Sequence, residues 1–233
     1  ESNTINGRPI YFLKGVENLI IPNGAGQVIL VDCSNVMIID QNLSCRYSIF
    51  LFNSSHCAIA YNEIDTIYLC AYLLNSSYNV IDNNLFTGIQ NFYCRGGIGN
   101  IIKYNIFNNG AIYVRSDENL VYKNNFINCS YFLSEGSNNC FNLSYPVGGN
   151  YYNNIDLIDV MSGSRQDIDG PDGIVDNPFF DHGWADYYPL MNPVSIPNEE
   201  DSWAPHFITT PIDEGRETQF YQYLVECNET VIW

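Results

Sequence analysis

The chain has 233 residues, and its 26 acidic against 9 basic side chains give a formal charge of −17. This negative charge repels phosphate backbones and argues against a nucleic-acid partner. Because 46% of the residues are hydrophobic and 15% aromatic, the chain is too apolar for a disordered acidic protein. No uninterrupted apolar run reaches about 18 residues, so we expect no membrane span. The composition is most unusual in its 31 asparagines, which outnumber the acids.

A repeat of about 20 residues organises residues 1–155. Each copy has an aliphatic residue, an asparagine three positions later, and usually Ile or Phe two positions after that. These asparagines are Asn42, Asn62, Asn84, Asn105 and Asn124, and successive members are separated by 20, 22, 21 and 19 residues. A short apolar segment precedes each copy, at residues 28–31, 49–52, 71–74, 92–94 and 112–114.

Two strand-like segments in each period predict an all-β fold, a parallel β-helix of about six to seven coils of 19–22 residues. Helical repeats need longer periods with apolar residues at helical spacing, and these are absent. A β-propeller blade needs about 40 residues. In a parallel β-helix each period forms one coil, and the coils stack at the spacing of neighbouring strands.

The recurring asparagines have a physical explanation in such a stack. Asparagine tolerates the left-handed conformation of a sharp corner, and its amide can bond to the amides in the coils above and below. We therefore predict a structural ladder, with ordinary loop asparagines as the alternative. The ladder would contain Asn42, Asn62, Asn84, Asn105 and Asn124. We also predict an aliphatic ladder of Ile39, Ile59, Ile81, Ile102 and Val121, and an aromatic one of Phe86, Phe107 and Phe126.

Both ends of this region resemble a known family. The opening Ile5-Asn-Gly-Arg-Pro-Ile-Tyr-Phe-Leu13, and the later Gly149-Asn-Tyr-Tyr152 and Asp186-Tyr-Tyr-Pro-Leu-Met191, resemble NosD-like proteins of the pectin-lyase-like superfamily. The resemblance covers residues 4–193 and implies a right-handed parallel β-helix. Many such relatives are surface proteins of archaea, and others bind or cleave carbohydrate.

Residues 156–193 differ from the repeat in being rich in acids and aromatic residues. Alternating Asp and Gly can wrap oxygen atoms around a hard cation, so we predict a calcium site, with a solvated turn cluster as the alternative. Its candidate ligands are Asp167, Asp169, Asp172 and Asp176. Pro171 interrupts the tighter Asp/Gly motif of the related proteins. The aromatic residues at 178–180 and 184–188 are expected to cap the open end of the helix, or else to stack on sugars.

The remaining residues are expected to form a linker at 194–202 and a tail at 203–233. The tail resembles the first strands of an immunoglobulin-like module, and about 30 residues are too few for such a sandwich. It would pack on the β-helix, donate a strand to another chain, or belong to a domain whose remainder is missing. Both ends of the chain look like cuts in a longer polypeptide.

Cysteine usage and glycosylation sequons favour an oxidising, extracellular location. The eight cysteines fit no zinc pattern, and they are read either as disulfides or as small buried side chains. The six N-x-S/T sequons are at Asn42, Asn53, Asn75, Asn128, Asn142 and Asn228.

Taken together, these features predict a non-catalytic extracellular assembly protein of a surface layer, sheath, filament or adhesin. Its partners would be other copies of itself or other surface proteins, through residues 203–233. A polysaccharide-binding module is the first alternative, and a row of exposed aromatics along one sheet would favour it. A polysaccharide lyase or epimerase is the second, and it would need a groove with Lys or Arg beside clustered Asp. We also expect Arg115 and Glu135 to pair across adjacent coils.

Overall fold

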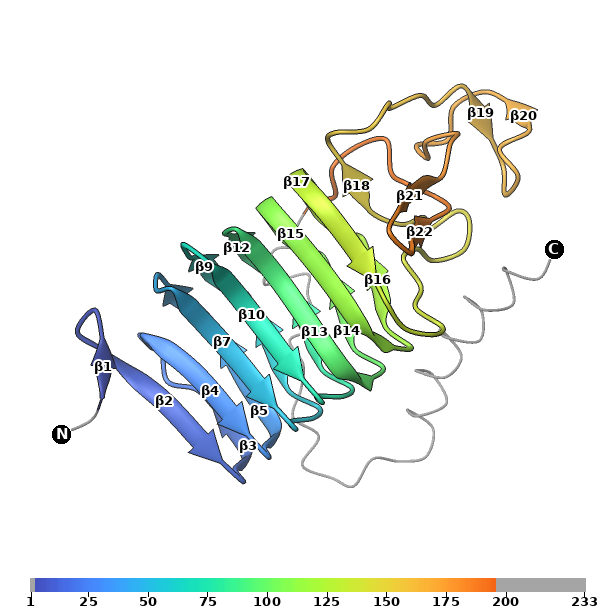
Figure 1. Ribbon diagram of the computed structural model, residues 1–233. Helices are drawn as coiled ribbons and strands as arrows, with labels where there is room; N and C mark the ends of the chain where they lie inside the picture. Colours follow the sequence, from blue (N-terminus) through green and yellow to red (C-terminus); the bar gives the residue numbers. More distant parts are fainter. Residues whose placement is uncertain (1–2, 196–233) are drawn as a thin grey trace.

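The computed structural model describes residues 3–195, which form a parallel β-helix with a small cap at its C-terminal end (Figure 1). All the elements of this region are strands, so the predicted all-β fold is confirmed. Within residues 3–195, no helix is long and apolar enough to span a bilayer. Most of the predicted linker and the whole of the predicted tail at 203–233 lie outside the described residues.

The coils have three faces. The long face consists of β2 (Arg8–Lys14), β4 (Gln27–Val31), β7 (Tyr47–Phe52), β10 (Leu69–Leu74), β13 (Gln90–Ile98), β15 (Ile106–Asp117) and β17 (Asn125–Ser134). The second face consists of β3 (Glu17–Ile20), β5 (Ser34–Ile39), β8 (Ala58–Ala60), β11 (Val80–Asp82), β14 (Ile101–Lys103) and β16 (Leu120–Tyr122). The third face consists of β6 (Asn42–Leu43), β9 (Glu63–Asp65), β12 (Leu85–Thr87), the first residues of β15 and β17, and β18 (Tyr151–Tyr152).

Short antiparallel pairs close the two ends. At the N-terminal end, β1 (Thr4–Ile5) pairs with β2. The cap contains β19 (Met161–Ser162) with β20 (Ile168–Asp169), and β21 (Phe179–Asp181) with β22 (Trp184–Asp186). Figure 1 shows the cap beyond the last coil, next to β17 and β18.

Identical side chains stack on one another inside the helix, because parallel strands in register bring equivalent positions together. Phe86, Phe107 and Phe126 form the predicted aromatic ladder, with ring centroids 5.0 and 5.2 Å apart and planes within 14° of parallel. Tyr152 of β18 continues the stack at 5.2 Å. All four rings are completely buried.

The aliphatic ladder is as predicted in four coils and wrong by one residue in the first. Ile59, Ile81, Ile102 and Val121 lie in consecutive register and are buried. The residue opposite Ile59 is Ile38, whereas Ile39 lies opposite Ala60.

The same slip affects the asparagine ladder. Asn62, Asn84, Asn105 and Asn124 are buried and bonded in sequence, but Asn42 is exposed and donates to Glu63 instead. Gln41 takes the expected place of Asn42, and its backbone N–H donates to Asn62 Oδ1 at 2.9 Å. The error arose because the true spacing in that coil runs from Ile38 to Gln41, where glutamine replaces asparagine.

Each rung of the ladder has the same two hydrogen bonds. The backbone N–H and the side-chain Nδ2 of one asparagine both donate to the Oδ1 of the asparagine in the next coil. From Asn62 to Asn84 these distances are 3.0 and 2.9 Å, and from Asn84 to Asn105 they are 3.0 and 2.9 Å. The ladder continues to Asn150, which was not predicted. A second ladder joins Asn79, Asn100, Asn119 and Asn139 in the same way.

The left-handed residue at each corner is the one before the ladder asparagine, not the asparagine itself. Tyr61, Asn83, Tyr104 and Lys123 have φ between 54° and 56°. This arrangement turns the chain sharply at the corner and directs the next side chain into the interior. The ladder amides then satisfy backbone groups inside the corner, which offsets the strain of left-handed Tyr and Lys.

Candidate functional site

The outer surface of the long face has a continuous row of large apolar side chains, which we call the aromatic row. Strand residues alternate between the two sides of a sheet, so the residues next to the buried core positions point outwards. The register places these outward side chains in line along the helix axis. The aromatic row consists of Phe12, Ile29, Phe50, Tyr72, Tyr93 and Tyr113. Phe12 is 61% exposed and the others are half-buried.

Only one neighbouring pair of the aromatic row is stacked like the rings of the inner ladder. Tyr72 and Tyr93 are parallel, 13° apart in plane with centroids at 5.1 Å. By contrast, Phe50 meets Tyr72 at 86° and Tyr93 meets Tyr113 at 87°. In an edge-to-face pair, the ring that contributes its edge keeps its faces free of that partner. The outer row therefore presents aromatic rings and phenolic hydroxyls in line along the axis.

A second outward row, two residues further along each strand, contains three of the nine basic side chains. We call Lys14, Arg95 and Arg115 the basic row. Arg95 lies opposite Leu74 in one neighbouring strand and Arg115 in the other. Arg95 is exposed and makes no ion pair with any residue of the described region. A positive group thus lies beside the tyrosines in a chain that is otherwise strongly acidic.

Arg115 connects the two rows. Its Nη1 donates to the Tyr93 hydroxyl at 3.2 Å, and its Nε lies 3.0 Å from Glu135 Oε2, as expected from the sequence. The hydrogen bond with Tyr93 and the charge of Glu135 raise the pKa of Arg115, so the group stays charged. These contacts hold the guanidinium against the aromatic row.

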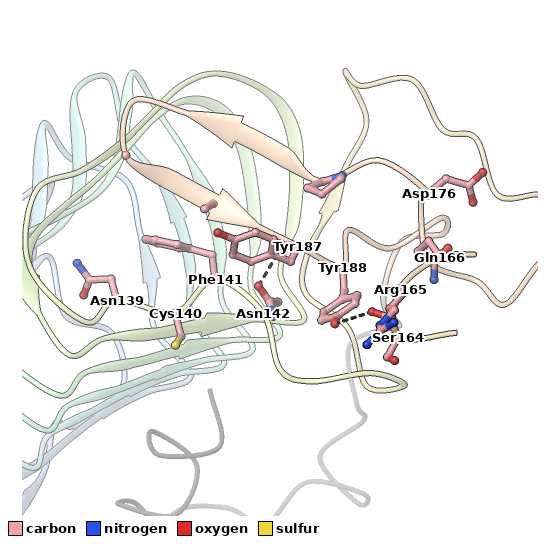
Figure 2. Close-up of a pocket in the computed structure, with 13 residues that line it drawn as sticks. Asn139, Cys140, Phe141, Asn142, Ser164, Arg165, Gln166, Asp176, Tyr187 and Tyr188 are labelled. Atoms are coloured by element: carbon pink, nitrogen blue, oxygen red, sulfur yellow. Dashed lines mark hydrogen bonds between the residues drawn. The ribbon is translucent and has the colours of Figure 1, made fainter. Parts of the chain in front are cut away.

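A hollow of about 480 Å³ lies where the cap meets the last coil (Figure 2). The Tyr187 backbone N–H donates to Asn142 Oδ1 at 3.1 Å, and the Tyr188 hydroxyl donates to the Ser164 carbonyl at 3.0 Å. The charged side chains that line the hollow are Arg165 and Asp176. The hollow is thus lined by one positive and one negative side chain.

The four predicted calcium ligands do not converge. Asp172 accepts from the backbone N–H groups of Gly163 and Ile174, and Asp176 accepts from two backbone N–H groups of the loop. Asp167 and Asp169 are exposed. Within residues 3–195, no group of three or more Asp, Glu, His or Cys is gathered as a set of metal ligands. In this structure the ordered acids stabilise the loop by accepting backbone hydrogen bonds.

The described sequons differ in accessibility. Asn42, Asn53, Asn75 and Asn128 have exposed side chains, whereas Asn142 is 7% exposed and accepts from Tyr187. Asn228 lies outside the described residues.

A fully buried carboxylate, Asp186, terminates the asparagine ladder. Its Oδ2 accepts from the backbone N–H and Nδ2 of Asn150 at 2.8 and 3.2 Å, in the pattern of every earlier rung. The Tyr152 hydroxyl donates to the same oxygen at 3.1 Å, and the Tyr188 backbone N–H donates to Oδ1 at 3.0 Å. Both carboxyl oxygens accept hydrogen bonds here, and in the ionised form they have no donor of their own, so the last rung leaves no amide N–H without a partner.

Gly149 is required by this arrangement. A Cβ atom at residue 149 would overlap the Asp186 carboxylate. Burial raises the pKa of Asp186 to about 7, although the hydrogen bonds from Asn150, Tyr188 and Tyr152 act in the opposite direction. The resemblance at Gly149–Tyr152 and Asp186–Met191 therefore marks two segments that contact one another.

Sequence reasoning missed the aromatic row because its members occupy short strands whose alternation was not assigned to inner and outer faces. The signal was present, since Tyr72, Tyr93 and Tyr113 follow one another at steps of 21 and 20 residues. It missed Asp186 because this residue belongs to a different segment and is 36 residues from Asn150.

Comparisons with known proteins add little to this geometry. No family model matches the chain, and no curated protein matches it. Among solved structures it is similar to a pectate lyase from Bacillus sp. N165, determined in complex with trigalacturonate. The two share 14% sequence identity and a TM-score of 0.39 over 95% of this chain and 94% of that one. This likeness is too distant to carry an argument about function.

The raised pKa of Asp186 predicts how stability depends on pH. Between pH about 4 and 7 the folded protein retains a proton that the unfolded chain has already lost, so stability falls as pH rises and levels off above 7. The difference of about 3 pH units corresponds to on the order of 4 kcal/mol. Denaturant unfolding of the wild type and of the variant Asp186→Asn, at several pH values between 4 and 7, measures how the free energy of unfolding changes with pH. Equal pH slopes in the two proteins would contradict the assignment.

Proposed function

We propose that the protein is an extracellular, non-catalytic polysaccharide-binding protein that holds a glycan chain along the outer surface of its long face. The observation that supports this best is the aromatic row. Aromatic faces stack on the apolar faces of sugar rings, and phenolic hydroxyls donate to and accept from sugar hydroxyls. A row that runs along the axis suits an extended polymer, because each coil presents the next contact at a regular strand spacing of about 4.8 Å.

The basic row favours an acidic polysaccharide over a neutral one. Arg95 presents a guanidinium with no ion pair among the described residues, and Arg115 lies in the next coil. A guanidinium pairs with carboxylate or sulfate oxygens by two parallel hydrogen bonds. The overall charge of −17 opposes such a ligand, so we expect binding to depend on the local attraction of these groups.

A structural role in a surface layer, sheath, filament or adhesin is the second candidate. The long ladders of hydrogen bonds favour it, because a stack of coils joined through satisfied ladder amides makes a rigid rod. The resemblance to NosD-like surface proteins and the exposed sequons support an extracellular location. The two roles are compatible, since a rigid rod on a cell surface can also present a glycan-binding face.

Binding to a uronate-containing polysaccharide should depend on the aromatic row. We expect the double variant Tyr72→Ala/Tyr93→Ala to lose at least tenfold in affinity by calorimetry, equivalent to about 1.4 kcal/mol. Arg95→Ala should weaken binding to acidic polymers more than to neutral ones.

The matched control is Phe180→Ala, because Phe180 is 61% exposed but lies in the cap. This control should bind like the wild type. Unchanged affinity of the double variant, or an equal loss in the control, would contradict the proposed site.

Calcium binding by Asp167, Asp169, Asp172 and Asp176 stays a prediction. If it occurs, we expect added calcium chloride to raise the melting temperature, and the variant Asp167→Asn/Asp169→Asn to lose that rise. The two exposed carboxylates are chosen because their replacement removes no described hydrogen bond. An identical melting temperature with and without calcium in the wild type would exclude the site.

A further inference from the structure

The second asparagine ladder ends without the acceptor that each of its earlier members has. In this ladder the backbone N–H of one asparagine donates to the Oδ1 of the next. The distances are 3.0 Å from Asn79 to Asn100, 3.1 Å from Asn100 to Asn119 and 2.9 Å from Asn119 to Asn139. Asn139 is the last member, and its own backbone N–H donates to no atom of residues 3–195.

The backbone at Asn139 nevertheless keeps the register of the ladder. The N–H of the residue after each ladder asparagine donates to the carbonyl of the asparagine in the preceding coil. Leu120 does so to Asn100 at 2.9 Å, and Cys140 does so to Asn119 at 2.8 Å. Because the backbone repeats in this way, the Asn139 N–H points like its predecessors towards the cap end of the helix.

The first asparagine ladder shows what completes such an end. There the backbone N–H of Asn150 donates to a carboxylate oxygen of Asp186 at 2.8 Å. Asn139 instead lines the hollow of about 480 Å³ between the cap and the last coil, and no described side chain takes the place of Asp186. A backbone N–H is a strong donor that needs an acceptor. An oxygen atom of a bound molecule would complete this ladder.

Arg165 gives the hollow a second group for recognition. Its side chain is exposed and forms no ion pair with any residue that the structure describes. Asp176, the other charged residue of the lining, accepts from the backbone N–H groups of Val160 and Met161 at 3.2 and 3.1 Å. The negative charge of the hollow is therefore engaged by the loop, whereas its positive charge is available to a ligand.

An aromatic ring completes the lining. Tyr187 is 44% exposed, and Figure 2 shows Asn139 and Arg165 on opposite sides of the hollow with Tyr187 between them in this view. The volume lies within the range of about 300–1,000 Å³ that is usual for small-molecule sites. A ligand that meets all three groups needs an acceptor at one end, an anion at the other and an apolar face.

We propose that the hollow binds a uronate, a sugar ring that carries a carboxylate. The carboxylate pairs with the guanidinium of Arg165, as carboxylates do in proteins. An oxygen of the sugar accepts from the Asn139 backbone N–H and supplies the missing rung. The apolar face of the ring packs on Tyr187. A free uronic acid and the uronate at the end of a polysaccharide chain share this chemistry.

This site is separate from the aromatic row, because no residue of that row lines the hollow. The two proposals can therefore fail independently of each other.

The first test is calorimetry with D-glucuronate and with D-glucose, which lacks the carboxylate. We expect the protein to bind glucuronate at least tenfold more tightly than glucose, and Arg165→Gln to lose at least tenfold in affinity for glucuronate. The matched control is Arg46→Gln, which replaces another exposed arginine far from the cap and should bind like the wild type. Absence of glucuronate binding, equal affinity for the two sugars, or an equal loss in both variants would overturn the proposal.

The second test follows the Asn139 backbone amide by nuclear magnetic resonance. We expect saturating glucuronate to slow hydrogen exchange at this amide at least tenfold. The Asn119 amide, which already donates within the ladder, should not change. Binding without any change at Asn139 would contradict the missing rung.

The same amide distinguishes the two sources of the ligand. Protection by both the monosaccharide and a short oligosaccharide that ends in glucuronate would assign the site to a chain end. Protection by the monosaccharide alone would assign it to a free uronic acid.

Discussion

The structure depends on one interaction, the hydrogen bond between buried side-chain amides in successive coils. An amide buried without partners costs several kcal/mol, so an inward asparagine is tolerated only where both its donors and its acceptor are satisfied. Here the Oδ1 of Asn84, Asn105 and Asn124 each accepts two hydrogen bonds from the preceding coil. This requirement fixes the register of the coils that the ladder joins, from Gln41 to Asn150, and with it the alignment of their outward side chains.

The ladder has a direction, and the cap follows from it. Every rung donates towards the C-terminal end, so the last rung must meet an acceptor that needs no further partner. Asp186 supplies it, and Trp184 of the same strand donates through Nε1 to the Tyr152 hydroxyl at 2.8 Å. The cap thus completes the hydrogen bonding of the coils while its aromatic rings cover the open end of the core. The cost is a buried carboxyl with a raised pKa, which makes the end of the rod its pH-sensitive part.

The fold was predictable from the sequence because the repeat encodes it directly. In each copy the inner aliphatic residue is followed three positions later by the inner amide, and two positions after that usually by an inner Ile or Phe. The prediction of the ladders was wrong in the first repeat. There the inner amide belongs to Gln41 instead of an asparagine, so the repeat was aligned on the neighbouring Asn42. The candidate site was less predictable. Tyr72, Tyr93 and Tyr113 recur at nearly the same period as the ladder asparagines, yet only the register shows that they share the outer surface. Asp186 is not part of the repeat. It belongs to the cap, and only the folded structure brings it next to Asn150 at the end of the ladder.

The most direct measurement of the ladder's role is the stability of a protein with one coil removed. Deleting residues 84–104 takes out 21 residues and joins Asn83 to Asn105, so Ile81 keeps an amide three positions later and Asn62 meets Asn105. We predict cooperative unfolding and an intact far-ultraviolet β spectrum. Deleting residues 84–103 instead leaves one extra residue at the corner and moves Asn105 out of the ladder, and this variant should be less stable by about 2 kcal/mol or more. Equal stability of the two deletions, measured by denaturant unfolding, would contradict the account.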